Sequence, residues 1–238
     1  MESPDLTQFL QPTPLLDYQA SPIQALIAQK GWEALPTKTA LIEAAYTFVR
    51  DEIAYGYTSR FQIPASVVLA SKQGNCITKT TLLMALLRRL GIPCRLKAGL
   101  VQKVIHRGLL HGMSYALSPA ELHHTWLEVR YNNRWIEIGG HIVDRPYLQK
   151  LQAKFPDFMG SFYGYGIAVI HFRNPPIQWE ENDTFVQDRA LKDSLGTFSD
   201  PDTFFKSYPQ AEKYTRSIRY KTILRSTLNS AISTLRQS

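Results

Sequence analysis

The chain has 238 residues, of which 44% are hydrophobic and 20% are charged. A chain of this length and composition can bury a full hydrophobic core, so it needs no disulfide or metal staples to fold. The net charge of +7 would favour an anionic partner, but the basic residues are spread along the chain, so we expect no nucleic-acid binding.

The two cysteines, Cys76 and Cys94, are too few for a disulfide framework. Free thiols are typical of a reducing compartment, and the first residues, Met1–Asp5, carry neither a basic region nor a long apolar run. We therefore expect a cytoplasmic protein with no signal peptide and no transmembrane segment. The histidines lack the spacing of metal ligands, and we expect no metal and no cofactor.

We expect the chain to divide into three parts. Residues 1–36 form an N-terminal helical extension with a helix over Pro22–Lys30. Residues 37–208 form the main domain, which begins with a helix over Leu41–Tyr55. Residues 209–238 form a basic amphipathic C-terminal helix. A charged terminal helix of this kind is usually docked on its domain with one face in solvent, and an anionic partner is the alternative.

The most informative motif is Gly74-Asn75-Cys76, which opens a helix that ends at Gly91-Ile92-Pro93. Asn75 is a favoured N-cap residue, and apolar residues on nearly all sides predict a buried helix. Cys76 lies in the first turn, where unpaired backbone N–H groups and the helix dipole stabilise an anion. We therefore expect Cys76 to be a nucleophile with a lowered pKa. The alternative is that Cys76 is a small core residue, and Cys94 is interpreted as a packing residue.

A second motif, His123–Tyr131, alternates like a half-buried strand and is followed by the two-residue turn Asn132-Asn133 and the strand Arg134–Ile138. Counting outward from the turn, Tyr131 faces Arg134 and Glu128 faces Glu137. His124 then lies near the entry of this hairpin. If the sheet packs beside the Cys76 helix, the His124 imidazole can take the thiol proton as a general base.

These motifs, together with Leu86–Arg95 between them, resemble the transglutaminase-like superfamily over about residues 40–150. The resemblance implies an α+β fold with a transglutaminase-like, papain-like core, in which a nucleophile helix packs on an antiparallel sheet. It also implies that Cys76 is the nucleophile and His124 the base of a Cys-His-Asp site. The absence of a second domain or a calcium-site pattern favours a bacterial-type, single-domain member over the large animal crosslinking enzymes.

The third member of the site departs from the family pattern. The family aspartate follows the hairpin tryptophan by four residues, and in this chain Gly139 occupies that position after Trp135. Three residues can replace it: Glu137 on the His124 face, His141 through a neutral hydrogen bond, or Asp144 beyond two glycines that permit a bulge. We favour Asp144 as the catalytic carboxylate. The alternative is that Asp144 only opens the turn before a helix over Tyr147–Lys154.

An acyl-transfer site also needs hydrogen-bond donors for the oxyanion. The backbone N–H of Cys76 at its helix start is one candidate, and the side chain of Gln73 is another, although a loop glutamine is more often solvated. We expect His123 to be exposed on the opposite strand face from His124. The aromatic, glycine-rich segment 158–166 is interpreted as core packing that leads into a strand over Ile167–Phe172.

The sequence thus predicts an enzyme in which Cys76 attacks an amide or peptide carbonyl and forms a thioester. The expected partners are a peptide, protein or small amide substrate and, for transamidation, an amine acyl acceptor. Hydrolysis and transamidation share every step up to the thioester, so the site residues do not choose between them. One alternative is a catalytically impaired scaffold that binds a peptide or protein, which the glycine at position 139 favours.

Overall fold

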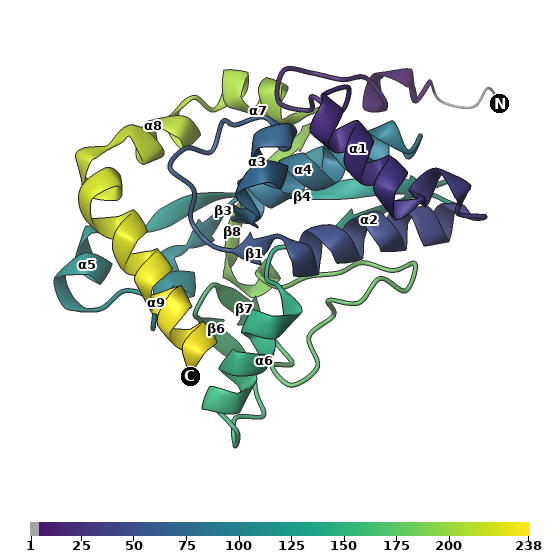
Figure 1. Cartoon of the computed structure of the whole chain (residues 1–238). Coiled ribbons are helices and arrows are strands. Elements are labelled where there is room, and N and C mark those ends of the chain that lie inside the picture. Colours follow the sequence, from purple (N-terminus) through teal and green to yellow (C-terminus); the bar gives the residue numbers. More distant parts are fainter. Residues whose placement is uncertain (1–4) are drawn as a thin grey trace.

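The computed structural model describes residues 5–238, and the predictions for Met1–Pro4 lie outside them. Its centre is an antiparallel sheet of four strands in the order β5-β4-β3-β8 (Figure 1). Helix α4 (Cys76–Arg89) packs on one face of this sheet, against β4 (Glu121–Tyr131) and β3 (Cys94–Gln102). The predicted α+β architecture, a buried helix on an antiparallel sheet, is therefore confirmed.

Helix α4 begins and ends where the sequence predicted. The Asn75 side chain accepts hydrogen bonds from the backbone N–H groups of Ile77 and Thr78, and the Thr78 hydroxyl accepts the Asn75 N–H in return. This reciprocal capping box satisfies N–H groups that a helix start otherwise leaves unpaired. All residues from Ile77 to Arg88 are buried. The capped start and buried body hold the first turn rigidly, with Cys76 at its first position.

The predicted hairpin is also present with the predicted register. Strand β4 pairs with β5 (Arg134–Ile138), Tyr131 opposite Arg134 and Glu128 opposite Glu137. Asn132 and Asn133 both have positive φ angles of 46° and 60°, as a tight two-residue hairpin turn requires. The pairing with β5 stops at Leu127 opposite Ile138. The first half of β4, which contains His124, therefore has β3 on one side and no β5 partner on the other.

Strand β8 (Leu191–Phe198) and helix α7 (Pro201–Ser207) were not predicted from the sequence. Strand β8 pairs with β3 as the edge strand of the sheet, and most of its residues are exposed. The glycine-rich segment forms a small hairpin of β6 (Phe162–Gly164) and β7 (Ile167–Val169), so the strand predicted over Ile167–Phe172 is shorter than expected.

The C-terminal residues are helical, as predicted, but they do not form one helix. Helix α8 (Gln210–Arg216) ends at Ser217, and a π-helical turn at Tyr220–Leu224 leads into α9 (Arg225–Gln237). Figure 1 shows these segments along one side of the molecule, with α9 running down to α6 (Arg145–Lys154). Leu228, Ile232 and Leu235 of α9 are buried, so its apolar side is docked on the domain. The division of the chain at residues 36 and 208 stays a prediction.

The remaining elements cover the opposite side of α4. Helices α2 and α3 pack against α4, and α1 packs on α3. A short parallel pair of strands, β1 and β2, follows α2 and α3 in the chain and leads into the start of α4. No helix of residues 5–238 is both long enough and apolar enough to cross a lipid bilayer. The bounds of these elements are α1 Ser21–Lys30, α2 Lys38–Glu52, β1 Ala54–Tyr55, α3 Ala65–Ser71, β2 Gln73–Gly74 and α5 Gly112–Leu117.

Candidate active site

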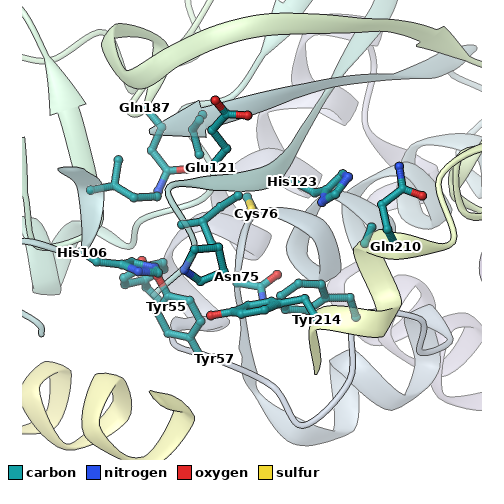
Figure 2. Close-up of a pocket in the computed structure, with 16 residues that line it drawn as sticks. Tyr55, Tyr57, Asn75, Cys76, His106, Glu121, His123, Gln187, Gln210 and Tyr214 are labelled. Atoms are coloured by element: carbon teal, nitrogen blue, oxygen red, sulfur yellow. The ribbon is translucent and has the colours of Figure 1, made fainter. Parts of the chain in front are cut away.

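Cys76 lies at the start of α4 and lines a cavity of about 220 Å³. The cavity is rich in aromatic rings, and Figure 2 shows them around Cys76 together with several polar side chains (Figure 2). Such a cavity can hold a small substrate group beside the thiol, since apolar and aromatic walls with a few polar groups are typical of ligand sites. The lining residues are Tyr55, Tyr57, Phe61, Asn75, Cys76, Val101, Ile105, His106, Pro119, Glu121, Leu122, His123, Gln187, Gln210, Ala211 and Tyr214.

The start of α4 meets β4 at Thr125, directly after His124. The Thr125 hydroxyl donates to the Cys76 carbonyl oxygen at 3.5 Å, and the Thr125 backbone N–H is one of the groups that stabilise the Cys76 thiolate. This contact forms where β5 no longer pairs with β4, so the edge of β4 is open to the helix start. The helix start thus contacts β4 at the residue that directly follows His124 in the chain.

The pKa of Cys76 differs from the expectation based on its helix position. Burial raises the pKa of the thiol to about 11, while backbone N–H groups of Thr125, Ile77 and Cys76 act in the opposite direction. The helix start therefore does stabilise the anion, but loss of solvent outweighs it. At neutral pH the resting site holds a protonated thiol rather than the thiolate that the sequence motif predicted.

His124 is buried, with 5% of its surface exposed, and its ring stacks on Trp126 with centroids 5.4 Å apart. Burial lowers its pKa to about 3, so the imidazole is neutral at physiological pH. Its Nδ1 has no hydrogen-bond partner, and no hydrogen bond joins it to Cys76 within residues 5–238. His124 lines a second cavity, of about 50 Å³, together with Gly139 and Gln187.

Asp144 does not orient His124 in this structure, contrary to the prediction. It is the N-cap of α6, and its two carboxylate oxygens accept hydrogen bonds from the backbone N–H groups of Tyr147 and Tyr55 and from the Arg236 guanidinium. Burial raises the pKa of Asp144, but the hydrogen bonds from Arg236 and Tyr55 outweigh it and hold the pKa below its usual range. The alternative interpretation, a residue that opens the helix, agrees with these contacts.

Glu137 and His141, the other two candidates to replace the family aspartate, also bond to groups other than His124. Glu137 accepts a hydrogen bond from Trp126 Nε1 at 2.6 Å and pairs with Lys97, although it lies in the wall of the His124 cavity. The His141 Nε2 atom is 3.1 Å from the Thr80 hydroxyl on α4. The position of the missing aspartate, Gly139, lies in the cavity wall beside His124.

The predicted oxyanion donor Gln73 lies outside the lining of the Cys76 cavity, and its Nε2 atom donates to Asn229 of α9. His123, predicted as exposed, is half-buried and lines the cavity with Cys76. Its ring packs near Phe204 and Tyr208, because the unpredicted helix α7 covers this side of β4. Cys94 is buried with its thiol against the Met84 carbonyl, in agreement with a packing role.

Two further cavity residues carried no signal in the sequence. His106 is buried, and its ring nitrogens bond to the hydroxyls of Ser118 and Tyr57, both at 2.9 Å. Gln187 lines both the Cys76 cavity and the His124 cavity. His106 ends one short 3₁₀ helix and Gln187 precedes another, and in such short segments hydrophobic periodicity gives no indication of which side chains point inward. Residues 5–238 contain no group of three or more His, Cys, Asp or Glu side chains arranged to hold a metal ion.

A comparison with known families agrees with the sequence motifs. The model of the transglutaminase-like superfamily matches residues 26–139, which include Cys76, His124 and Gly139. A search of curated proteins found no match. One similar solved structure is that of a "putative cysteine protease" from Cytophaga hutchinsonii, with 16% identity and a TM-score of 0.49, over 85% of this chain and 50% of that one. This chain thus spans about half the length of that protein. Residues 26–139 of this chain are thus similar to the transglutaminase-like superfamily.

Proposed function

We propose that the protein catalyses thiol-dependent acyl transfer or hydrolysis at an amide or peptide carbonyl, with Cys76 as nucleophile and His124 as general base. The observation that supports this proposal is the contact of the α4 start with β4 at Thr125: the Cys76 thiol lines a substrate-sized cavity, and the residue before Thr125 is the buried, neutral His124. A neutral imidazole is the form that can accept a proton.

The pKa directions favour a concerted first step. Since the thiol and the imidazole are both uncharged at neutral pH, the thiol proton passes to His124 as the Cys76 sulfur bonds to the carbonyl carbon. The tetrahedral oxyanion is stabilised by backbone N–H groups at the start of α4, among them that of Cys76. The imidazolium then gives its proton to the leaving nitrogen, the C–N bond breaks, and a thioester remains on Cys76.

The thioester is resolved by the same groups. His124 takes a proton from water or from an amine, which attacks the thioester carbonyl and releases an acid or a new amide. The Cys76 thiolate that leaves recovers the proton from His124. Both acceptors use the same residues, so the proposal covers hydrolase and acyltransferase chemistry alike.

The test is trapping of the acyl-enzyme. The protein is incubated separately with two matched small acyl donors, an N-acyl glutamine amide and the corresponding methyl ester. The peptide that contains Cys76 is then analysed by mass spectrometry. We expect acylation of Cys76 that is lost in Cys76→Ala and lowered about 100-fold or more in His124→Ala, because general-base assistance contributes roughly 10²–10⁴. His171→Ala is the matched control, since His171 is exposed and lies outside both cavities.

The pH profile separates concerted transfer from a preformed thiolate. With the base neutral throughout, the acylation rate should change less than about twofold between pH 6 and pH 8. A reaction that needs a free thiolate with a pKa of about 11 should instead rise roughly tenfold per pH unit over the same range. The steeper profile would contradict the role given to His124.

A binding scaffold is the second candidate function. The observations that favour it are Gly139 at the position of the family aspartate and the unpartnered Nδ1 of His124. A scaffold predicts no acylation of Cys76 by either donor and unchanged peptide binding in Cys76→Ala. The acyl-enzyme experiment therefore decides between the two functions.

A further inference from the structure

Gln187 is a buried polar residue between the two cavities of the site. It is 3% exposed and lies just before strand β8, outside the segment that matches the family model. Its side chain lines the cavity of Cys76 and also the cavity of His124. Figure 2 shows Gln187 and Cys76 entering the same cavity from different elements.

The orientation of the Gln187 amide is fixed by one hydrogen bond. Its Nε2 atom donates to the Gly166 carbonyl oxygen at 2.6 Å. A carbonyl oxygen accepts and never donates, so the Nε2 end must face Gly166 and the Oε1 end must face away from it. The Oε1 atom is buried and has no hydrogen-bond partner among residues 5–238. Buried acceptors are almost always paired, which points to a partner supplied by a ligand.

The charges around the cavity indicate which kind of group would fit. None of the lining residues named above is Lys or Arg, although the whole chain contains 27 of them. The lining contains one carboxylate, Glu121, which pairs with Lys192, and burial holds His106 neutral by lowering its pKa. The cavity therefore has no cationic donor at Cys76. Its buried polar atoms without a partner among residues 5–238 are the acceptor Gln187 Oε1 and two groups that can donate, Asn75 Nδ2 and the Tyr214 hydroxyl, so it suits an uncharged group that carries both N–H and C=O.

We propose that Gln187 Oε1 accepts a hydrogen bond from the N–H of the scissile amide. Through this hydrogen bond, Gln187 selects amide over ester acyl donors. This inference rests on the proposed function. The leaving nitrogen must lie within reach of both Cys76 and His124, and Gln187 is the residue shared by their two cavities. An ester oxygen in the same place has no hydrogen to donate, so Gln187 Oε1 stays unpaired beside it.

The expected discrimination follows from that unpaired acceptor. A buried polar group left without its partner weakens the complex by roughly 10- to 100-fold, and sites built to bond a substrate N–H reject analogues that lack it. The effect should appear in the rate of Cys76 acylation with the amide donor and be absent with the ester. A residue that only holds the loop in place would change both rates together.

The experiment measures Cys76 acylation by the matched amide and ester in three variants. Gln187→Met keeps the size of the side chain and removes the acceptor, so we expect the amide rate to fall at least tenfold while the ester rate stays within threefold. In Gln187→Glu, burial raises the pKa of the carboxyl, and the neutral acid can both donate to Gly166 and accept from the substrate. This variant should therefore keep the amide preference. Gln102→Met is the matched control, because Gln102 is exposed at the end of β3.

A second probe pair keeps the inference testable if the chain does not catalyse acylation. Iodoacetamide carries an amide N–H and methyl iodoacetate does not, as in the amide and ester donors. Both reagents alkylate a thiol without catalysis. Relative to glutathione, Cys76 should prefer iodoacetamide about tenfold, and Gln187→Met should abolish this preference. Loss of acylation with a retained alkylation preference would refute the proposed function alone. Equal effects of Gln187→Met on both members of each pair would overturn the role of Gln187.

Discussion

Buried histidines should make this protein sensitive to mild acid. His106 and His124 are 1% and 5% exposed, and burial lowers the pKa of each from 6.5 to about 3. In the unfolded chain the same rings titrate near 6.5. The unfolded state therefore takes up these protons first. The stabilisation that depends on neutral rings is complete above pH 6.5 and is lost as the pH falls from 6.5 toward 3.

The magnitude at pH 5 follows from these values. The pH is then about 1.5 units below the unfolded pKa, and each unit corresponds to about 1.4 kcal/mol, so each ring lowers the free energy of unfolding by about 2 kcal/mol. The two together give about 4 kcal/mol, against a typical total of about 5–15 kcal/mol. His141 is fully buried and its pKa is also lowered, so it acts in the same direction.

Urea unfolding followed by tryptophan fluorescence at pH 7.5, 6.5, 5.5 and 5.0 tests this reasoning. The wild-type free energy of unfolding should fall steeply below pH 6.5. In His106→Asn one titrating ring is removed, so the slope at pH 5–6 should be smaller by about 1.4 kcal/mol per pH unit. His171→Asn, at an exposed position, should keep the wild-type slope. A change below about 1 kcal/mol between pH 7.5 and pH 5.0, or an unchanged slope in His106→Asn, would refute it.

Two further predictions concern contacts that support the site. Arg236→Ala removes both guanidinium hydrogen bonds to the buried Asp144 carboxylate. It should lower the free energy of unfolding, measured in urea, by about 2–3 kcal/mol. Arg219→Ala, on the exposed surface, is the control. If Asp144→Asn instead left stability intact and stopped Cys76 acylation, a structural role for Asp144 would be wrong. Asn75→Ala removes the N-cap of α4 and should cost about 1–2 kcal/mol by the same assay, and a loss below about 0.3 kcal/mol would contradict the capping role.

The sequence predicted the features that depend on local patterns. Asn75 and the residues after Arg89 mark the ends of α4, because capping and termination are satisfied within a few residues of the chain. The hairpin register follows from the two-residue turn at Asn132-Asn133, since the turn length fixes the pairing of both strands. These local features were enough to place Cys76 and His124 on the two elements that meet at the site.

The features that the sequence missed depend on distant packing. Strand β8 is an exposed edge strand with little hydrophobic alternation, so neither β8 nor the Gln187 segment before it was predicted. The raised pKa of Cys76 arises from burial by several elements, whereas the helix position alone indicates a lowered pKa. The contact of Asp144 with Arg236 was not predicted, because the two residues are 92 positions apart in the sequence.

The C-terminal segment is structurally part of the candidate site, although it lies outside the residues that match the family. Ala211 and Tyr214 of α8 form one wall of the Cys76 cavity. Arg236 of α9 bonds to Asp144, whose carboxylate in turn accepts the backbone N–H of Tyr55, another residue of the cavity wall.

Asn229 of α9 bonds to the backbone N–H and carbonyl of Tyr57, so a second cavity residue is also held from the C-terminal segment. The matched segment thus supplies Cys76, His124 and most residues that line the Cys76 cavity, while residues beyond it supply Gln187, Gln210, Ala211 and Tyr214. Substrate choice in this protein is therefore expected to depend on these four residues as well as on the matched core, because substrate contacts away from the reacting atoms decide specificity.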